Sequence, residues 1–289
     1  MKIYCVLLIL FLGIIPKTFQ AQEFRYPVPP DSLLNRHDRI VYMLEHFWDE
    51  QNIADTMLLK KPKFMLDYLY LLNQTDNEEK NKFITSFAMS ISNHNQACMD
   101  LFWLLDSILY DSSSSYYNEE LYRIFLEAFM DTDIDSSFKS LLEDRLKIVK
   151  TNQMGHIANN FLFVDKKGAT HRLYEINTPL LLLIFNDPDC PLCRQTEKCI
   201  NKNKHIQKLM ANETLKVLAV TPCSEYYKWL VYSYPKNWIV GFDKDKVIYK
   251  SHLYDIQRLP SIYLLDKYKR VLLKEADYKR LYDFLIDFY

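Results

Sequence analysis

The feature that most constrains the fold is an apolar run that leads into a pair of cysteines. Residues 179–185 begin with proline and continue as six apolar side chains, which is typical of a strand buried on both faces of a sheet. The tetrapeptide Cys190–Cys193 follows and opens a helical pattern that continues to about Met210. Reactive groups gather at the carboxyl edge of open α/β sheets. The pattern therefore predicts an α/β fold with both thiols at that edge.

The position of the two cysteines favours thiol–disulfide exchange. Cys190 would lie beside the free N–H groups and the positive dipole end of the helix, and both stabilise the thiolate that acts as the nucleophile. Pro191 suits the first turn of a helix, where its missing N–H costs little. Cys193 lies three residues further on, so its sulfur can resolve a mixed disulfide. The order of strand, CxxC and helix is the context that a redox dithiol requires.

Charged residues flank the cysteines and act in opposite directions. Asp187 and Asp189 oppose a thiolate at Cys190, whereas Arg194 favours it. The net effect of these charges therefore stays open at the level of the sequence.

Two structural interpretations compete with exchange. A static disulfide between Cys190 and Cys193 would close a short loop and add little stability, because the gain grows with loop length. A zinc site could also use Cys199 and His205, but one helix cannot turn all four side chains toward a single point. Exchange is therefore the preferred interpretation.

After residue 150 the chain alternates between strand and helix patterns. The expected elements are a hairpin from 161–165 and 171–176, a central strand at 215–220, a helix at 225–233, a short edge strand at 238–240, a hairpin from 261–266 and 271–274, and a closing helix at 278–288. This alternation predicts a mixed sheet flanked by helices, mainly parallel and finished by an antiparallel pair.

A proline stands directly before the strand expected at 261–266. Pro260 cannot donate to a sheet ladder, so it belongs at the first residue of a strand or in a turn. A cis bond before such a proline is a rare and deliberate feature. Pro260 is therefore a candidate site residue.

From Asp31 to about Lys150 the pattern is helical throughout. Apolar residues recur three and four apart at 39–48, 64–72, 83–91, 99–110, 121–130 and 138–149. The polar stretches 111–115 and 131–135 offer Asp and Ser caps for the helices that follow. A fixed-period repeat is not evident, so a helical solenoid is a weak alternative. The pattern predicts an all-helical domain over residues 22–150.

The N-terminus has the order of a secretory signal peptide. Lys2 precedes an apolar run at 3–15, which is followed by a polar stretch with a cleavage point after Ala21. The run is short for a membrane-spanning helix. We therefore expect residues 1–21 to be removed and the mature chain to be exported without stable membrane insertion.

Composition excludes two functional classes. The chain carries 36 basic and 37 acidic residues, a net charge of −1, and this balance argues against nucleic-acid binding. It contains only four glycines and no GxGxxG or GxxxxGK[ST] pattern, which argues against a phosphate-binding loop.

Export changes the interpretation of the remaining cysteines. Removal of Cys5 leaves five, an odd number that cannot form a closed disulfide framework within one chain. Cys98 and Cys199 are expected to be buried on helices, as free cysteines often are. Cys223 follows the strand at 215–220 and should lie at the same sheet edge as the CxxC. It is either an auxiliary resolving thiol for Cys190 or a quiet, half-buried one.

The stretch from Gly155 to the C-terminus resembles the TlpA-like branch of the thioredoxin superfamily. The likeness is carried by an entry motif at 155–161, by the hairpin residues Lys167, Gly168 and Leu173, and by Cys190, Cys193 and Pro260. The resemblance implies that Cys190 attacks, that Cys193 resolves and that Pro260 is a cis-proline beside them. It also implies a substrate groove at Pro191, Leu192 and Leu259. The segment 39–49 gives the helical half a weaker likeness to an uncharacterised domain that precedes such modules in exported bacterial proteins.

The activity and location of this family are therefore what we expect for this chain. The resemblance implies disulfide reduction or relay in the periplasm without a bound cofactor or metal. The partners would be disulfide-containing exported proteins and an upstream redox protein. Two positions depart from the branch, which usually has Trp at the position of Asp189 and Thr or Val at that of Leu259. Redox potential and partner choice are therefore not carried over.

The sequence thus predicts a two-domain α+β protein. Residues 1–21 form the signal peptide, 22–150 the all-helical domain and 151–289 a thioredoxin-like α/β domain that begins with a hairpin. The predicted activity is that of a thiol–disulfide oxidoreductase. The alternative is a non-catalytic scaffold in which the helical domain docks a protein partner.

Overall fold

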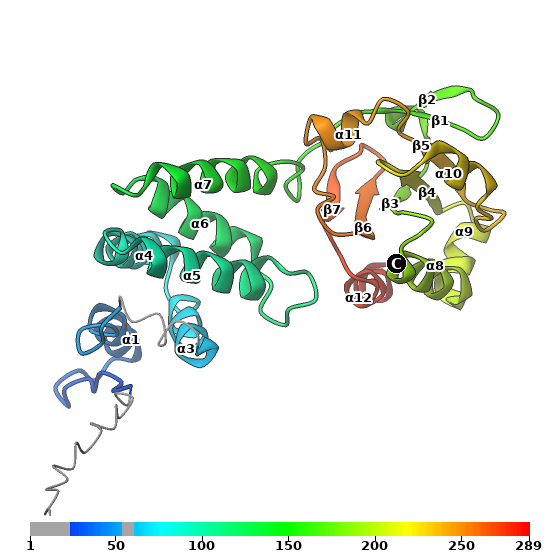
Figure 1. Cartoon of the computed structure of the whole chain (residues 1–289). Helices are drawn as coiled ribbons and strands as arrows, with labels where there is room; N and C mark the ends of the chain where they lie inside the picture. Colours follow the sequence, from blue (N-terminus) through cyan, green and yellow to red (C-terminus); the bar gives the residue numbers. More distant parts are fainter. Residues whose placement is uncertain (1–23, 54–60) are drawn as a thin grey trace, which may run out of the picture.

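The structure is a computed structural model that describes residues 24–53 and 61–289. Helices precede a seven-stranded sheet along the chain (Figure 1). The helices of the first part are α1 (Arg36–Glu45), α3 (Pro62–Leu72), α4 (Asn77–Ile91), α5 (Asn95–Leu105), the π-helix η1 (Asp106–Tyr110), α6 (Glu119–Met130) and α7 (Ser136–Val149). The predicted signal peptide lies outside the described residues.

Short polar side chains begin several of these helices. Asp76 accepts a hydrogen bond from the N–H of Glu79 at the start of α4, and Asp135 accepts one from Ser137 at the start of α7. The cap of α6 is Asn118, which lies beyond the stretch 111–115 where the sequence pattern put it. The sequence pattern missed Asn118 because several polar residues precede α6, and only one of them is needed as its cap.

The helical part has an aromatic-rich core of its own. Phe87 lies between Trp48 and Phe125, with ring centroids 5.0 and 6.5 Å away. Cys98 is 1% exposed within the same cluster, which confirms that it is a core residue. The buried residues of this cluster run from Phe24 to Val149, so the core ends where α7 ends.

The second part is built on one mixed sheet with the strand order β2-β1-β5-β4-β3-β6-β7. The strands are β1 (Leu162–Val164), β2 (Thr170–Arg172), β3 (Leu180–Phe185), β4 (Leu215–Thr221), β5 (Ile239–Phe242), β6 (Ser261–Asp266) and β7 (Val271–Leu273). Only the β3–β4 and β4–β5 pairs are parallel. The expectation of a mainly parallel sheet is therefore wrong.

The strand predicted at an edge also lies elsewhere. β5 pairs with β4 on one side and with β1 on the other, so it is internal. The N-terminal hairpin of β1 and β2 covers the edge that β5 would otherwise expose. The second half of the predicted strand at 171–176 is a short 3₁₀ turn, Leu173–Glu175.

Strand β3 is buried on both faces, as its continuous apolar run predicted. Leu182 belongs to the cluster under helices α8 (Pro191–Lys202), α9 (Lys204–Ala211) and α12 (Tyr278–Phe288). Its neighbour Leu183 belongs to the cluster on the opposite face, which includes Ile248 of α11 (Val247–Lys250). Alternate residues of a strand point to opposite faces, so one run serves both clusters.

The long helix predicted at 190–210 is two helices. Asn203 ends α8, and its side chain accepts from the N–H of Ile206 to begin α9. The apolar period continues across this break, which explains why the pattern predicted a single helix. Helix α10 (Tyr226–Val231) matches its prediction within two residues, and α11 was not predicted.

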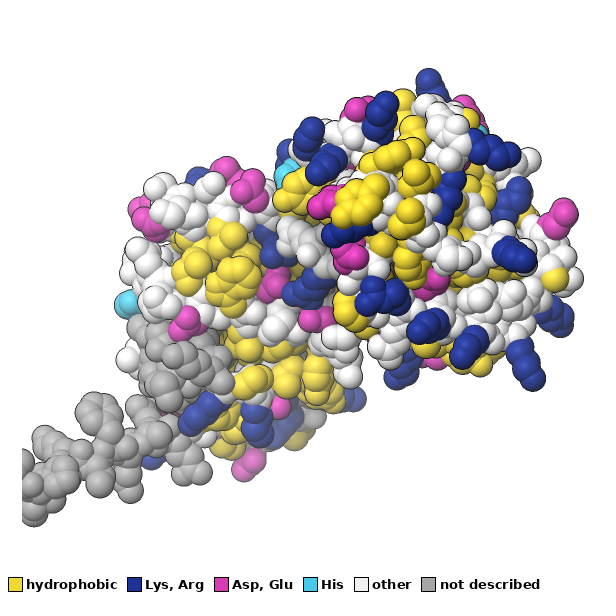
Figure 2. Space-filling model, turned by 45° about the vertical axis from the view of Figure 1, so that its right-hand side comes forward, with side chains coloured by type: hydrophobic (Ala, Val, Ile, Leu, Met, Phe, Trp, Pro, Cys, Tyr) yellow, Lys and Arg dark blue, Asp and Glu magenta, His cyan; other side chains and the backbone are white. Residues whose placement is uncertain are grey.

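The helical and sheet parts touch along one side, where basic and acidic side chains lie (Figure 2). Lys274, fully buried after β7, pairs with Glu119 of α6 at 3.2 Å. Its ammonium also donates to the carbonyl of Val149 at 2.8 Å.

Within the described ranges, the chain contains no helix with the length and apolarity that a membrane span needs.

Candidate active site

The first cysteine of the motif is the cap of helix α8. β3 ends at Phe185, a loop follows, and α8 begins at Pro191. The sulfur of Cys190 accepts the backbone N–H of Cys193 at 3.1 Å. The N–H groups of a first helical turn have no partner within the helix, so an acceptor at the cap satisfies one of them. The same donors and the helix dipole favour negative charge on that sulfur.

A buried polar network supports the loop between β3 and Cys190. The N–H of Asn186 donates to the carbonyl of Val220 on β4 at 3.0 Å. Thr221 and Tyr234 lie within hydrogen-bond distance of the Asn186 side chain, at 3.4 and 3.3 Å. The neighbouring strand thereby fixes the start of the loop. The sequence pattern did not identify these residues, because their contacts are made across the sheet.

The two cysteines have unlike environments. Cys190 is partly exposed, whereas Cys193 is 3% exposed. Burial raises the pKa of the Cys193 thiol, and its hydrogen bond with Cys190 adds to this effect. One sulfur of the pair is therefore accessible to a second molecule, and the other is held inside as a thiol.

The loop before β6 faces the accessible sulfur. The Sγ atom of Cys190 donates to the carbonyl oxygen of Leu259 at 3.7 Å. The peptide bond between Leu259 and Pro260 is cis. The structure thus brings the loop of Leu259 and Pro260 against the CxxC, although 69 residues separate Leu259 from Cys190.

The two residues between the cysteines are exposed. Pro191 lies on the surface at the first position of α8, and the side chain of Leu192 is 56% exposed. Apolar surface beside an accessible sulfur can contact an incoming chain. The groove expected at Pro191, Leu192 and Leu259 stays a prediction.

Two of the charged residues near the site have partners that the sequence analysis did not identify. The carboxylate of Asp189 pairs with Lys228 of α10 at 2.6 Å. Arg194 donates to the carbonyl oxygen of Pro188 at 2.6 Å. Lys228 therefore offsets the acidic residue before Cys190. Its role could not be found from sequence, because nothing local links α10 to the cysteine loop.

Cys223 follows β4 and is exposed as a residue, although it was expected to be half-buried or to act as an auxiliary resolving thiol. Partial burial of its sulfur and the nearby carboxylate of Asp187 nevertheless raise the pKa of this thiol. Within the described residues, the sulfur of Cys190 is hydrogen-bonded to Cys193 and Leu259 and not to Cys223. An auxiliary role for Cys223 stays a prediction.

The prediction that Cys199 is buried is also wrong, because it is only partly covered on α8. His205 faces elsewhere, with its Nε2 atom 3.2 Å from the carbonyl oxygen of Leu285. The described part of the chain holds no group of three or more His, Cys, Asp or Glu that is arranged to bind a metal ion.

The helical part matches a protein family. Residues 14–152 match the family described as a domain of unknown function, DUF5106. A search of curated proteins finds no relative.

Solved structures also resemble the chain. A thioredoxin-like protein from Bacteroides caccae is 29% identical, with a TM-score of 0.79 over 93% of this chain and 99% of its own. The C-terminal domain of an uncharacterized protein from Bacteroides fragilis is 34% identical over 47% of this chain and 98% of its own, with a TM-score of 0.46. The thioredoxin domain of a thiol-disulfide oxidoreductase from Bacteroides vulgatus is 18% identical over 46% and 98%, with a TM-score of 0.40.

The mixed sheet, its flanking helices and the first of these similarities define an α+β protein with a thioredoxin-like fold. The similarity to the Bacteroides caccae protein extends through the helical part, so the arrangement of helices before the sheet is shared with that protein.

Proposed function

We propose that the protein is a thiol–disulfide oxidoreductase that acts through Cys190 and Cys193. The observation that carries this proposal is the position of the Cys190 sulfur. It caps the N-terminus of α8, accepts the N–H of Cys193 and is accessible, whereas Cys193 is buried. A helix N-terminus favours the thiolate, which is the form that attacks disulfides. A structural thiol would have no need of this environment.

The proposed reaction has two exchange steps. The Cys190 thiolate attacks one sulfur of a substrate disulfide, which forms a mixed disulfide and releases the other substrate sulfur as a thiolate. Cys193 then loses its proton and attacks the Cys190 sulfur. The second substrate sulfur leaves as a thiolate, and a Cys190–Cys193 disulfide forms. Two electrons have passed to the substrate, and an upstream dithiol must supply two more to restore the enzyme.

A model disulfide substrate tests this proposal. We expect the protein to reduce a disulfide-bonded peptide in the presence of dithiothreitol. The Cys190→Ser variant should be inactive. When the reduced Cys193→Ser variant is mixed with the peptide after dithiothreitol has been removed, a mixed disulfide with the peptide at Cys190 should accumulate, visible as an added mass. A Cys190→Ser variant with the activity of the native protein would instead favour a scaffold role.

The location of the activity is also part of the proposal. The charged and apolar order of residues 1–21 supports export and cleavage after Ala21, which would put the substrates among exported proteins that contain disulfides. The similarity of the sequence to the TlpA-like branch supports the same compartment. N-terminal mass analysis of the protein from the periplasmic fraction tests this, and a chain that retains Met1 in the cytoplasmic fraction would contradict it.

A further inference from the structure

Arg258 joins the site loop to the helical part. Its guanidinium pairs with the carboxylate of Asp111 at 2.7 Å and with that of Asp106 at 3.3 Å. Both acidic residues belong to the helical part, at and just after the π-helix η1. Arg258 itself lies two residues before Pro260 in the loop that faces Cys190. A cation on one part of the protein is thus held by two anions on the other.

One of the anions that hold Arg258, Asp106, is itself held in place. The side chain of Asp106 is 6% exposed, and its other oxygen pairs with Arg145 at 3.3 Å. It also accepts the hydroxyl of Tyr122 at 2.9 Å. A buried carboxylate with three partners has little freedom to move, because each lost partner would leave buried charge or polar surface unpaired. Asp106 is therefore a rigid support for Arg258.

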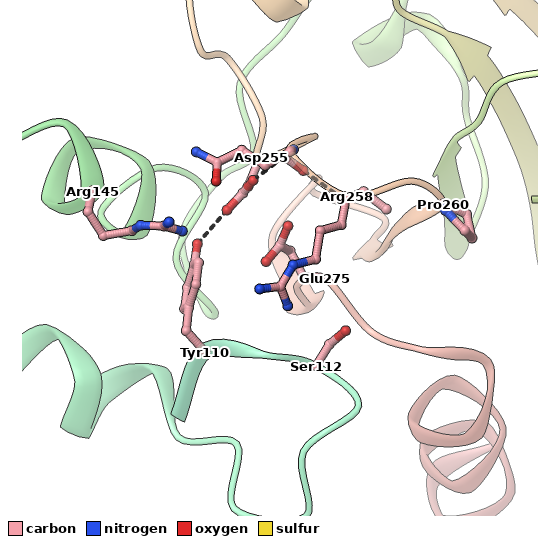
Figure 3. A pocket seen from close by; sticks show the side chains of 9 residues that line it. Tyr110, Ser112, Arg145, Asp255, Arg258, Pro260 and Glu275 are labelled. Carbon is pink, nitrogen blue, oxygen red and sulfur yellow. Dashed lines mark hydrogen bonds between the residues drawn. The ribbon is translucent and has the colours of Figure 1, made fainter. Parts of the chain in front are cut away.

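The start of the same loop is attached to the helical part as well. The hydroxyl of Tyr110 donates to the carboxylate of Asp255 at 2.6 Å, the bond drawn in Figure 3. The carbonyl oxygen of Asp255 accepts the hydroxyl of Ser261 at 2.7 Å, which closes the loop at its base. Figure 3 shows Tyr110 and Arg145 pointing from the helical side toward Asp255 and Arg258 on the other.

The junction is packed rather than open. The cavity among Tyr110, Arg145, Asp255 and Arg258 has a volume of about 30 Å³. One water molecule needs about 10–15 Å³ of such space, so the cavity holds about two or three water molecules and is too small for a substrate group. The contacts there hold the loop and do not form a binding pocket.

The loop links Arg258 directly to the residue that contacts the Cys190 sulfur. Leu259, whose carbonyl oxygen accepts the Cys190 thiol at 3.7 Å, follows Arg258 directly. We propose that Arg258 is a positioning residue, through which Asp106 and Asp111 of the helical part hold the Leu259 carbonyl against Cys190. This inference rests on the proposed function. The helical part then acts on the chemistry of the dithiol through the site loop.

The direction of the effect follows from the hydrogen bond. A carbonyl oxygen accepts from the thiol form of Cys190 and offers nothing to the thiolate or the disulfide. Loss of the Arg258 ion pairs should let the carbonyl move and so destabilise the thiol alone. Cys190 of the variant should then react with alkylating reagents more readily, and the Cys190–Cys193 disulfide should form more readily. Arg258 is 58% exposed, so we expect changes of a few fold rather than of orders of magnitude.

The test compares five variants of the full chain, one of which combines Arg258→Met with Asp111→Asn. Arg258→Met removes the cation of the Arg258–Asp111 ion pair, and Asp111→Asn removes its anion. Arg258→Lys keeps the positive charge, and Arg280→Met is the control. Arg280 contacts the helical part by lying over the Tyr117 ring at 4.1 Å, and it is not in the site loop. Two quantities are measured: the rate of Cys190 alkylation by iodoacetamide at pH 6, and the equilibrium of the dithiol with glutathione.

We expect Arg258→Met and Asp111→Asn to raise the alkylation rate about threefold and to shift the glutathione equilibrium about threefold toward the disulfide, roughly 14 mV. The double variant should show no more than the larger single effect. Arg258→Lys should lie nearer the native protein, and Arg280→Met should equal it. Equal values for the native protein, Arg258→Met and Arg280→Met would overturn the inference. If Arg258→Met does not fold, the test rests on Asp111→Asn alone, because Asp111 is partly exposed and its substitution is better tolerated.

This test separates the inference from the proposed function. A native dithiol that does not exchange with glutathione contradicts the proposed function itself. A native dithiol that exchanges normally, with variants that match it, contradicts only the role of Arg258.

Discussion

The backbone N–H of Cys193 donates to the sulfur of Cys190 at 3.1 Å, although the thiol of Cys193 is itself buried. The residue proposed to resolve the mixed disulfide thus also stabilises charge on the attacking sulfur. This relationship follows from the CxxC spacing, because the third residue of a helix donates its N–H to the cap.

The pH dependence of the second step is the first prediction. Burial raises the pKa of the Cys193 thiol, and this cause persists in the mixed disulfide, where Cys190 no longer bears a proton. The attacking form of Cys193 is the thiolate, so resolution should accelerate about tenfold per pH unit between pH 6 and 8. Rapid mixing of the mixed disulfide at several pH values measures this rate. A rate independent of pH over that range would contradict the assignment.

Lys228 should assist the attacking thiolate. It pairs with Asp189 at 2.6 Å, directly before Cys190 in the chain. In Lys228→Met the carboxylate of Asp189 is no longer offset, and alkylation of Cys190 at pH 6 should slow about twofold, since exposed pairs have modest effects. Asp189→Asn should act in the opposite direction. The double variant lacks both charges, so its rate should lie between those of the single variants and near the native rate, and a double variant as slow as Lys228→Met would argue against electrostatics.

The stability of the junction should fall as pH rises, because of Glu275. Burial and the nearby carboxylate of Asp255 raise the pKa of Glu275 well above its usual value. A carboxyl group whose pKa is raised by folding contributes full stability below its unfolded pKa of about 4.3 and loses it as pH rises toward the folded value. Glu275→Gln mimics the protonated form, so it should remove this loss.

Thermal unfolding of the native protein and of Glu275→Gln tests the sign of this pH effect on stability. At pH 4 the native protein and Glu275→Gln should unfold at nearly the same temperature. At pH 8 the variant should be more stable by about 2 °C or more, given the usual sensitivity of a chain of this size. Glu143→Gln, a change on an exposed residue of α7, is the matched control and should show no such pH-dependent gain. A variant less stable than the native protein at pH 8 would contradict the prediction.

Cys223 should be dispensable for exchange. It is exposed at the same sheet edge, but the sulfur of Cys190 is hydrogen-bonded to Cys193 and Leu259 instead. Cys223→Ser should therefore reduce a model disulfide at the native rate, within about a factor of two. Mass mapping of the partly oxidised native protein is the second check. A Cys190–Cys223 disulfide as a major species would establish Cys223 as a resolving thiol.

The parts of the site that are local in sequence could be predicted. The run in β3, the CxxC after it and Pro260 before β6 each combine a short pattern with one physical rule. Those rules concern burial on both faces, capping of a helix and the missing N–H of proline. The helices of the first part were likewise found from their apolar period.

What could not be predicted depends on contacts between distant segments. Nothing near Arg258 in the sequence points to Asp111, and nothing near Asp189 points to Lys228. The position of β5 was wrong because a strand pattern gives no information about its neighbours in the sheet. The break at Asn203 was missed because the apolar period continues through it.

The most direct test of the account is the redox equilibrium of the Cys190–Cys193 pair in the mature protein. The protein is equilibrated in buffers of reduced and oxidised dithiothreitol or glutathione, trapped with a thiol reagent and weighed by mass analysis. The account predicts a reversible two-electron transition of this pair, with a midpoint between about −270 and −120 mV as in other proteins of this fold. A pair that stays reduced or stays oxidised across the whole range would contradict it.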